Sequence, residues 1–238
     1  MKPVVFEIKK VNQFRNPPAI EHSLIEEFFG KKRNGYYVEV GANHPRSGSQ
    51  TWHLEELGWK GLLIEPLPEY CELLKKERKG TVVQYACSSP ENHDKVLRLK
   101  MAGGHSTLNL NPIARSSQAE QTIEVRCRTL DSIFEENKVK AGFDFISVDI
   151  EGHEMEMFKG FSLAKWRPRL VLLEDHVIDH RKHNYMKAQG YQIILRTGLN
   201  SWYVPASEKY KFSLLSNLEK FRKYWFGLLF RKVQYSRM

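Results

Sequence analysis

Cysteine is scarce in this sequence, and its placement follows no pattern. The three cysteines, Cys71, Cys87 and Cys127, include no Cys-x-x-Cys pair. An odd number without paired spacing excludes a disulfide framework and a zinc knuckle. No run of about 18 uncharged apolar residues occurs, and the N-terminal M-K-P-V-V-F-E-I-K-K is too short and too charged for a signal-peptide core. The sequence therefore predicts free thiols in a cytoplasmic protein, with no segment for export or membrane spanning.

The two common phosphate-binding loops are also missing. Gly48-Ser49-Gln50 lacks the lysine of a Walker A loop. Gly41 and Gly48 stand too far apart, with Pro45 between them, for the G-x-G-x-x-G fingerprint. The loop that follows residues 36–40 is therefore not expected to hold a nucleotide phosphate.

Positive charge is unevenly distributed. The chain carries +9, of which residues 209–238 account for +7, so residues 1–208 carry only +2. Enzymes that act on nucleic acids line their clefts with cations and aromatic side chains. A near-neutral body therefore argues against a nucleic-acid partner, and the basic tail indicates a separate attachment segment.

The order of predicted elements indicates an α/β domain, and 238 residues suffice for one large core. We expect strands at 36–40, 61–64, 81–85, 143–148, 169–173, 191–195 and 201–204. We expect helices at 20–29, 49–57, 68–79 and 130–134, the last capped by Thr129, and one more that ends at Gln189. Strands that alternate with helices predict a parallel sheet.

Residues 95–128 depart from this alternation of elements. Apolar and polar residues alternate at 96–99 and 122–125, and the stretch 101–117 between them is rich in Gly and Ser. This pattern predicts an inserted β-excursion with a mobile loop.

Polar residues follow several predicted strands, where ligands bind in doubly wound sheets. Glu39 makes the first loop unsuited to an anion, but a carboxylate there suits a zwitterion with an amino group. Glu65, at the end of the next strand, can accept hydrogen bonds from both hydroxyls of a ribose. S-adenosylmethionine, a nucleoside that carries an amino acid, meets both demands.

Several motifs in the sequence also resemble those of one family. They are V-E-V-G-A-N, S-G-S-Q-T and L-E-E-L-G-W-K-G-L-L-I-E-P in the first half, and R-T-L-D-S-I-F, D-F-I-S-V-D-I-E-G-H-E and V-L-L-E-D-H in the second. Over roughly residues 36–205 the chain resembles the FkbM family of S-adenosylmethionine-dependent methyltransferases. It departs from that pattern at Gln50, where Asn is more usual before Thr.

The resemblance implies a class I methyltransferase fold, a Rossmann-like, doubly wound, seven-stranded sheet whose last strand is antiparallel. It implies cofactor contacts from Glu39, Gly41 and Asn43 to the methionine end, from Glu65 to the ribose and from the Ala86-Cys87-Ser88 turn to the adenine edge. The cofactor-binding residues expected on this basis are Glu39, Gly41, Asn43, Thr51, Glu65, Cys87 and Ser88.

The catalytic residues that we expect are Asp149, His153, Glu174 and His176. An alcohol needs a base to lose its proton as the new bond forms, and the sequence does not decide between His153 and His176. His180 and His183 are interpreted as solvated helix residues. If a divalent metal takes part, its expected ligands are Asp149, Asp175 and His176, although orientation of the acceptor by hydrogen bonds alone is favoured.

The C-terminal segment predicts a basic amphipathic helix. Leu214, Leu218, Phe221, Trp225 and Leu228 recur at helical spacing. Such a helix suits the surface of an anionic membrane, or it packs on the body of the protein or on a second subunit. The expected organisation is a lead-in with one helix at 1–35, a methyltransferase domain at 36–207 and this helix at 208–238.

We therefore expect an O-methyltransferase that acts on a sugar hydroxyl of a bacterial surface glycan, such as lipopolysaccharide, capsule or a lipid-linked oligosaccharide. The expected location is cytoplasmic, with the C-terminal helix allowing peripheral attachment to the inner membrane. Methylation of a small natural product and a non-catalytic membrane scaffold remain alternatives, and the oligomeric state stays open.

Overall fold

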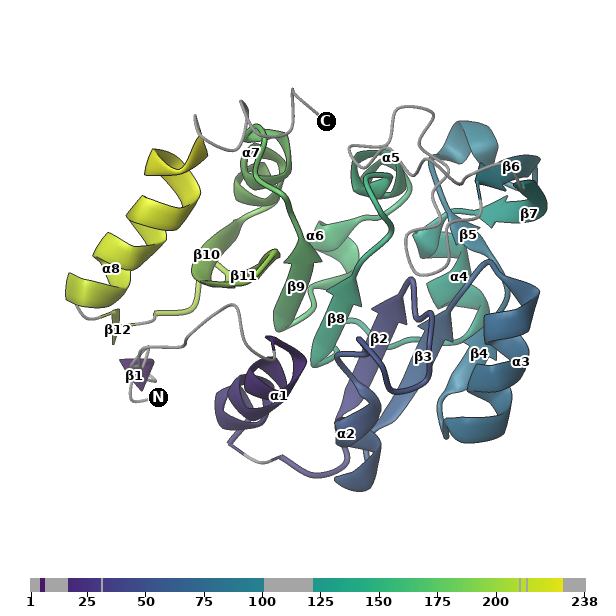
Figure 1. Ribbon diagram of the computed structural model, residues 1–238, viewed down its shortest axis with the longest axis horizontal. Coiled ribbons are helices and arrows are strands. Elements are labelled where there is room, and N and C mark those ends of the chain that lie inside the picture. The colour runs from purple at the N-terminus through teal and green to yellow at the C-terminus, as the bar shows by residue number, and fades with distance from the viewer. Residues whose placement is uncertain are drawn as a thin grey trace.

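The centre of the molecule is a seven-stranded, mostly parallel sheet (Figure 1). The computed structural model describes residues 5–6, 17–30, 32–100, 122–209, 211–212 and 214–228. The strand order is β10-β11-β9-β8-β2-β3-β4, and β11 is antiparallel to both of its neighbours. A parallel sheet that ends in a hairpin with one reversed strand is the arrangement expected from the sequence.

The strands of this sheet are β2 (Tyr36–Val40), β3 (Lys60–Ile64), β4 (Thr81–Val83), β8 (Phe145–Val148), β9 (Leu170–Glu174), β10 (Tyr191–Thr197) and β11 (Asn200–Pro205). The helices are α1 (Pro17–Phe28), α2 (Trp52–Glu56), α3 (Pro68–Glu77), α4 (Leu130–Glu136), α5 (Glu154–Lys159), α6 (Leu163–Trp166), α7 (Arg181–Ala188) and α8 (Leu214–Phe221). A 3₁₀ turn lies at Pro90–Asn92 and a π-helical turn at Arg222–Phe226. No helix in the described residues is both long and apolar enough to cross a membrane.

Helices cover both faces of the sheet, which explains why the central strands are buried along almost their whole length. Successive side chains of a strand point to opposite faces, so Val38 and Val40 join one core while Tyr37 joins the other. The first core contains residues of α4, α5, α6 and α7, and the second contains residues of α1, α2 and α3. The lead-in helix α1 is thereby packed into the domain through Ile25, which is fully buried.

The predicted β-excursion is confirmed. Strands β6 (Val96–Lys100) and β7 (Thr122–Arg128) pair antiparallel, and β5 (Ala86–Cys87) extends them to a small second sheet. Thr129 caps α4 by accepting a hydrogen bond from the N–H of Ser132. The predicted loop at 101–117 lies outside the described residues.

Two expectations for the first half of the chain are corrected. The helix predicted at 49–57 is only α2, because Ser49 and Thr51 donate their hydroxyls to Glu39 and stay in the preceding loop. A parallel pair of short strands, β1 (Val5–Phe6) and β12 (Lys211–Phe212), was not foreseen from the sequence. This pair joins segments that precede and follow the main sheet.

The C-terminal helix is present, but it is not uniform. The α-helical turns of α8 end at Phe221, and the chain continues in a π-helical turn. His180 and His183 are not the solvated residues that the sequence suggested, because their rings lie 4.3 Å and 5.7 Å from the ring of Trp225 in this turn. The π-helical turn therefore contacts α7 through Trp225.

Arg78, at the end of α3, is the centre of a buried network of polar groups. It is 7% exposed, and its guanidinium donates to Glu55 Oε1 at 3.1 Å, to Thr51 Oγ1 at 2.7 Å and to the carbonyl of Pro45 at 3.1 Å. It also lies 3.5 Å from Glu39 Oε2. One cation thus compensates two buried carboxylates from β2 and α2 and fixes the loop between these elements.

Removal of this cation should cost much of the stability of the fold. We predict that Arg78→Ala lowers the free energy of unfolding by about 3–5 kcal/mol, because Glu39 and Glu55 are left buried without a counter-charge. Chemical denaturation measures this, with the exposed Lys76→Ala as a control that should change stability by less than about 0.5 kcal/mol. A loss no larger in Arg78→Ala than in the control would show that the network does not hold the loop.

Candidate active site

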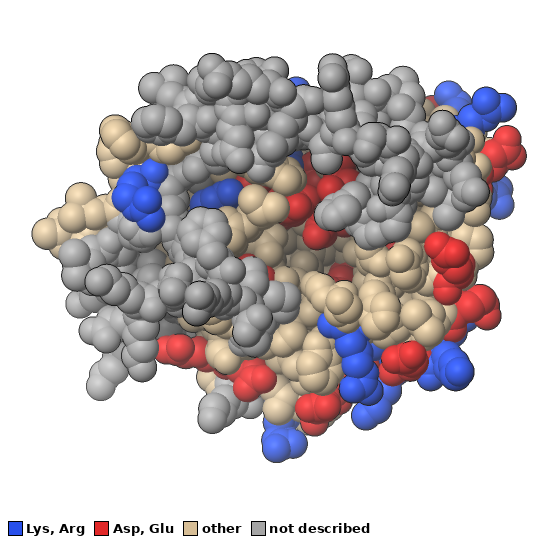
Figure 2. Space-filling model, in the orientation of Figure 1, with Lys and Arg blue, Asp and Glu red and all other residues tan. Residues whose placement is uncertain are grey.

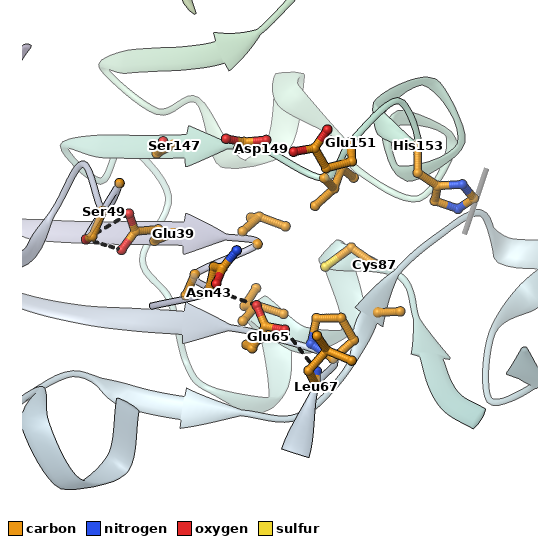
Figure 3. Close-up of a pocket in the computed structure, with 18 of the residues that line it drawn as sticks. Glu39, Asn43, Ser49, Glu65, Leu67, Cys87, Ser147, Asp149, Glu151 and His153 are labelled. Carbon is orange, nitrogen blue, oxygen red and sulfur yellow. Dashed lines mark hydrogen bonds between the residues drawn. The ribbon is translucent and has the colours of Figure 1, made fainter. Parts of the chain in front are cut away.

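A cavity of about 140 Å³ opens at the carboxyl ends of β2, β3 and β8. Figure 2 shows acidic side chains around a hollow on this face, and Figure 3 shows the cavity itself. Four carboxyl groups line it, those of Glu39, Glu65, Asp149 and Glu151, and the described lining residues include no Lys or Arg. Such a lining favours a cation or a neutral polyol and disfavours a phosphate.

Glu65 presents its carboxylate to the cavity at the end of β3 (Figure 3). Its Oε2 accepts the N–H of Asn43 at 2.8 Å, and its Oε1 accepts the N–H of Leu67 at 2.9 Å. Asn43 has a left-handed backbone, with φ of 49°, which turns its N–H toward β3. Each carboxylate oxygen keeps a second lone pair, so this fixed group can still accept two hydroxyl donors.

Glu39 also lines the cavity, but its carboxylate is already committed to its own loop. It accepts hydrogen bonds from Ser49 Oγ, from the N–H of Gln50 and from Thr51 Oγ1, and it lies beside Arg78. Thr51 itself is fully buried and is not among the residues that line the cavity. This position suits a residue that orients Glu39 through a hydrogen bond, not a residue that contacts a ligand.

Gly41 lines the cavity, and the backbone around it explains why a side chain is absent. Its φ is +79°, and a Cβ atom there would lie 1.8 Å from the carbonyl oxygen of Asp149. The loops after β2 and β8 therefore cross in direct contact. This crossing brings Asp149 next to the loop that carries Asn43.

Ala86 and Cys87, which form β5, line the opposite wall. Cys87 is buried in the lining, and burial raises the pKa of its thiol, so it acts as an apolar wall and not as a thiolate. Ser88 does not line the cavity, and its hydroxyl lies 3.0 Å from Nε2 of His153. His153, at the start of α5, is therefore turned toward this wall, and burial lowers the pKa of its ring.

The ends of β8 and β9 bring together a second group of titratable side chains. Glu151, Glu174 and His176 each offer an atom within 4.8 Å of the others. Asp149 joins this group through a hydrogen bond with Glu174. Burial raises the pKa of Asp149, and the charges of Glu174 and Glu151 add to this rise.

Asp175, which was predicted as a metal ligand with Asp149 and His176, does not belong to this group. Its carboxylate accepts the N–H of Val177. Asp175 is not among the residues whose ligand atoms lie within 4.8 Å of one another at this place. The residues in the described part of the chain that could hold a metal are Glu151, Glu174 and His176.

His176 and Glu174 form a pair beside the cavity. Nε2 of His176 lies 3.5 Å from Oε1 of Glu174, and this hydrogen bond is the main reason that the pKa of His176 is raised. Neither residue is in the cavity lining, but their partners Asp149 and Glu151 are. The predicted catalytic residues thus separate into His153 on the Cys87 wall and the other three around Glu174.

Sequence reasoning missed several polar residues near the cavity. Gln50 and Asn200 line it, and Glu21 of α1 is fully buried behind them. Burial raises the pKa of Glu21 to about 7, with hydrogen bonds from Thr197, Asn200 and Gln50 opposing that rise. Arg78 was missed as well, since K-K-E-R-K-G reads as a solvated helix end. No local pattern marks these residues, because their partners lie far away in sequence.

The sequence matches the family model described as the methyltransferase FkbM domain over residues 39–193. No protein of curated function shows a significant match. Among solved structures, methyltransferase FkbM from Methylobacillus flagellatus KT is 18% identical, with a TM-score of 0.48, and the match covers 79% of this chain and 50% of that one. The chain therefore spans half the length of that relative.

Two further solved structures are similar at low identity. Precorrin-6y C5,15-methyltransferase from Geobacter metallireducens GS-15 is 12% identical, with a TM-score of 0.43, and 84% of this chain and 92% of that chain are covered. Trm1 from Pyrococcus horikoshii, in complex with S-adenosyl-L-methionine, is 12% identical, with a TM-score of 0.40, and 86% and 60% are covered. The family assignment comes from the family model and not from these likenesses.

The cavity and the family match agree on the cofactor. A lining of carboxylates without Lys or Arg fits a sulfonium cation, and a fixed carboxylate at the end of β3 fits a ribose. The matched segment spans more than half of the chain and contains the end of β2 and all of β3, β8 and β9. The chain belongs to the FkbM family of S-adenosylmethionine-dependent methyltransferases.

Proposed function

We propose that this methyltransferase acts on a hydroxyl oxygen of a glycan. The observation that carries the proposal is the pairing of His176 with Glu174, next to the cavity carboxyl groups of Asp149 and Glu151. A histidine with a raised pKa can accept a proton from a hydroxyl, and neighbouring carboxylates can accept hydrogen bonds from the other hydroxyls of a sugar.

The residues around Glu174 have different roles in methyl transfer. S-adenosylmethionine supplies an electrophilic methyl group, but a neutral alcohol is a weak nucleophile. His176 removes the proton of the alcohol, and Glu174 stabilises the imidazolium that results. The pKa of Asp149 is raised and that of Glu174 is lowered, so any proton that this pair binds is held by Asp149, and Glu174 keeps its negative charge beside the imidazolium.

Substitution of His176 should abolish the chemical step while leaving cofactor binding intact. We expect His176→Ala to lower kcat about 10²–10⁴-fold, the usual effect of losing a general base, with S-adenosylhomocysteine affinity within about threefold of wild type, because the side chain does not line the cavity. His153→Ala is the matched variant and should lose much less activity. A large loss in His153→Ala with activity retained in His176→Ala would assign the base to His153.

The pH dependence of the same assay tests the partnership with Glu174. His176 must be neutral to accept a proton, and Glu174 raises its pKa, so Glu174→Gln should lower that pKa. We therefore expect the acid limb of the kcat profile to move to lower pH in Glu174→Gln. An unmoved limb, measured over the full profile, would contradict the pairing.

The C-terminal helix supports the choice of a membrane-associated acceptor. Leu214, Leu218 and Phe221 are 76%, 55% and 59% exposed, and Phe226 is 65% exposed. Segment 209–238, which contains them, carries +7. Exposed apolar side chains on a basic helix suit the interface of an anionic bilayer. We propose that this segment binds the cytoplasmic face of a bacterial inner membrane, where lipid-linked glycans are presented.

Vesicle flotation tests the membrane part of the proposal. The chain should float with vesicles that contain anionic phosphatidylglycerol and remain unbound with phosphatidylcholine alone. Leu218→Ser with Phe221→Ser, which keeps every charge, should abolish flotation because the apolar contact is lost. Flotation of this variant at the wild-type level, or no flotation of wild type, would remove the membrane from the proposal and leave the methyltransferase assignment untouched.

A further inference from the structure

Helix α1 is joined to the cofactor loop by two consecutive residues. Glu21 Oε2 accepts the side-chain N–H of Gln50 at 2.6 Å, and Nε2 of His22 lies 2.8 Å from the carbonyl oxygen of Ser49. Glu21 lies outside the segment that matches the family, residues 39–193. A helix that precedes the matched domain (Figure 1) thus reaches the wall of its cavity.

Glu21 also holds the turn between β10 and β11. Its Oε1 accepts the hydroxyl of Thr197, and both of its oxygens accept the side-chain N–H₂ of Asn200, at 3.0 Å and 3.1 Å. Asn200, like Gln50, lines the cavity, and it also lies outside the matched segment. One buried carboxylate therefore orients two amides of the cavity lining that come from different segments of the chain.

The orientation of the Gln50 amide follows from this contact. A carboxylate only accepts hydrogen bonds, so the amide must turn its nitrogen to Glu21 and its oxygen away. That oxygen, Oε1, is buried and has no donor among the described residues, and Gln50 is 9% exposed. A buried carbonyl oxygen without a donor costs about 1–3 kcal/mol. Because Gln50 lines the cavity, an N–H donor of a bound ligand that reaches this oxygen removes the cost.

The place of Gln50 in the cavity indicates which part of a ligand it meets. Glu65 suits the ribose, and the Cys87 wall follows it toward the adenine, so the amino-acid end lies near the loop of Ser49 and Gln50 (Figure 3 labels Ser49 and Glu39 on that side). The carboxylate of Glu39, on the same side, already accepts hydrogen bonds from its own loop and lies beside Arg78. The α-ammonium group of the cofactor has three N–H donors and needs other acceptors.

We propose that the amide oxygen of Gln50, oriented by Glu21 and accompanied by the amide of Asn200, forms the acceptor site for the α-ammonium group of S-adenosylmethionine. Gln50 and Asn200 are then cofactor-binding residues, and Glu21 is a positioning residue whose negative charge, one layer behind, polarises both amides toward a cation. Through Glu21, helix α1 contributes to cofactor binding. The inference rests on the cofactor orientation given above.

The test compares two ligands that differ only by the amino group, S-adenosylhomocysteine and its deamino analogue. Titration calorimetry is carried out at a pH of about 8, above the pKa of Glu21. Wild type should prefer S-adenosylhomocysteine by about tenfold or more, as expected for a hydrogen bond to a charged group. Gln50→Leu should reduce this preference to about twofold or less, and Glu21→Gln should reduce it in the same direction by a smaller factor.

The ratio of the two affinities separates binding from folding. A variant that merely loosens the loop loses both ligands equally and keeps the wild-type preference, which would overturn the proposal. Glu27→Gln, the same substitution at an exposed position of α1, is the control and should keep both affinities. If Glu21→Gln fails to fold, Gln50→Leu decides alone.

The result for wild type distinguishes failure of the ammonium site from failure of the cofactor assignment on which it rests. Binding of both ligands with equal affinity would overturn the ammonium site and leave the cofactor site standing. Failure of wild type to bind either ligand would overturn the cofactor site itself, and the inference with it.

Discussion

The buried guanidinium of Arg78 is the constraint on which the cofactor loop depends. It compensates Glu39 from β2 and Glu55 from α2, and it also holds Thr51 and the carbonyl of Pro45. A buried carboxylate without such compensation would be too costly to keep charged. The carboxylate oxygens of Glu39 are therefore engaged by this network. A ligand in the cavity must use other acceptors that still have a free lone pair, such as Glu65 and Gln50.

The contact at Gly41 connects this loop to the second half of the site. The carbonyl oxygen of Asp149 lies where a Cβ of residue 41 would be, so the ends of β2 and β8 meet without intervening side chains. The cofactor-facing loop and the group around Glu174 are therefore held in fixed relation. Rigid placement of this kind is what in-line methyl transfer requires, since misalignment of about 1 Å is costly.

Much of the fold could be predicted from the sequence because its signals are local. Apolar runs and their spacing marked the central strands and helices, and the rule that ligands bind beyond strand ends pointed to Glu39, Glu65 and Asp149. For a metal, the sequence pointed to Asp149, Asp175 and His176, whereas the structure groups His176 with Glu174 and Glu151 and engages the carboxylate of Asp175 with the N–H of Val177.

The features that the sequence did not predict depend on contacts that join distant segments. Glu21 and Asn200 meet across most of the length of the chain, and Arg78 reaches Glu39 only once β2 and α3 are packed. Thr51 and Ser88 were placed near the cavity by sequence, but their hydroxyls are used by Glu39 and His153. Local patterns identify residues near a site, whereas tertiary packing decides which of them face the ligand.

The claim that supports all others is that the cavity beside Glu65 binds the cofactor. Titration calorimetry of S-adenosylhomocysteine with wild type, Glu65→Gln and Glu65→Ala tests it most directly, with thermal melting to show that each variant is folded. The account predicts binding to wild type and at least about tenfold weaker binding to both variants, because the ribose loses a charged acceptor. Equal affinity in folded wild type and variants would contradict it.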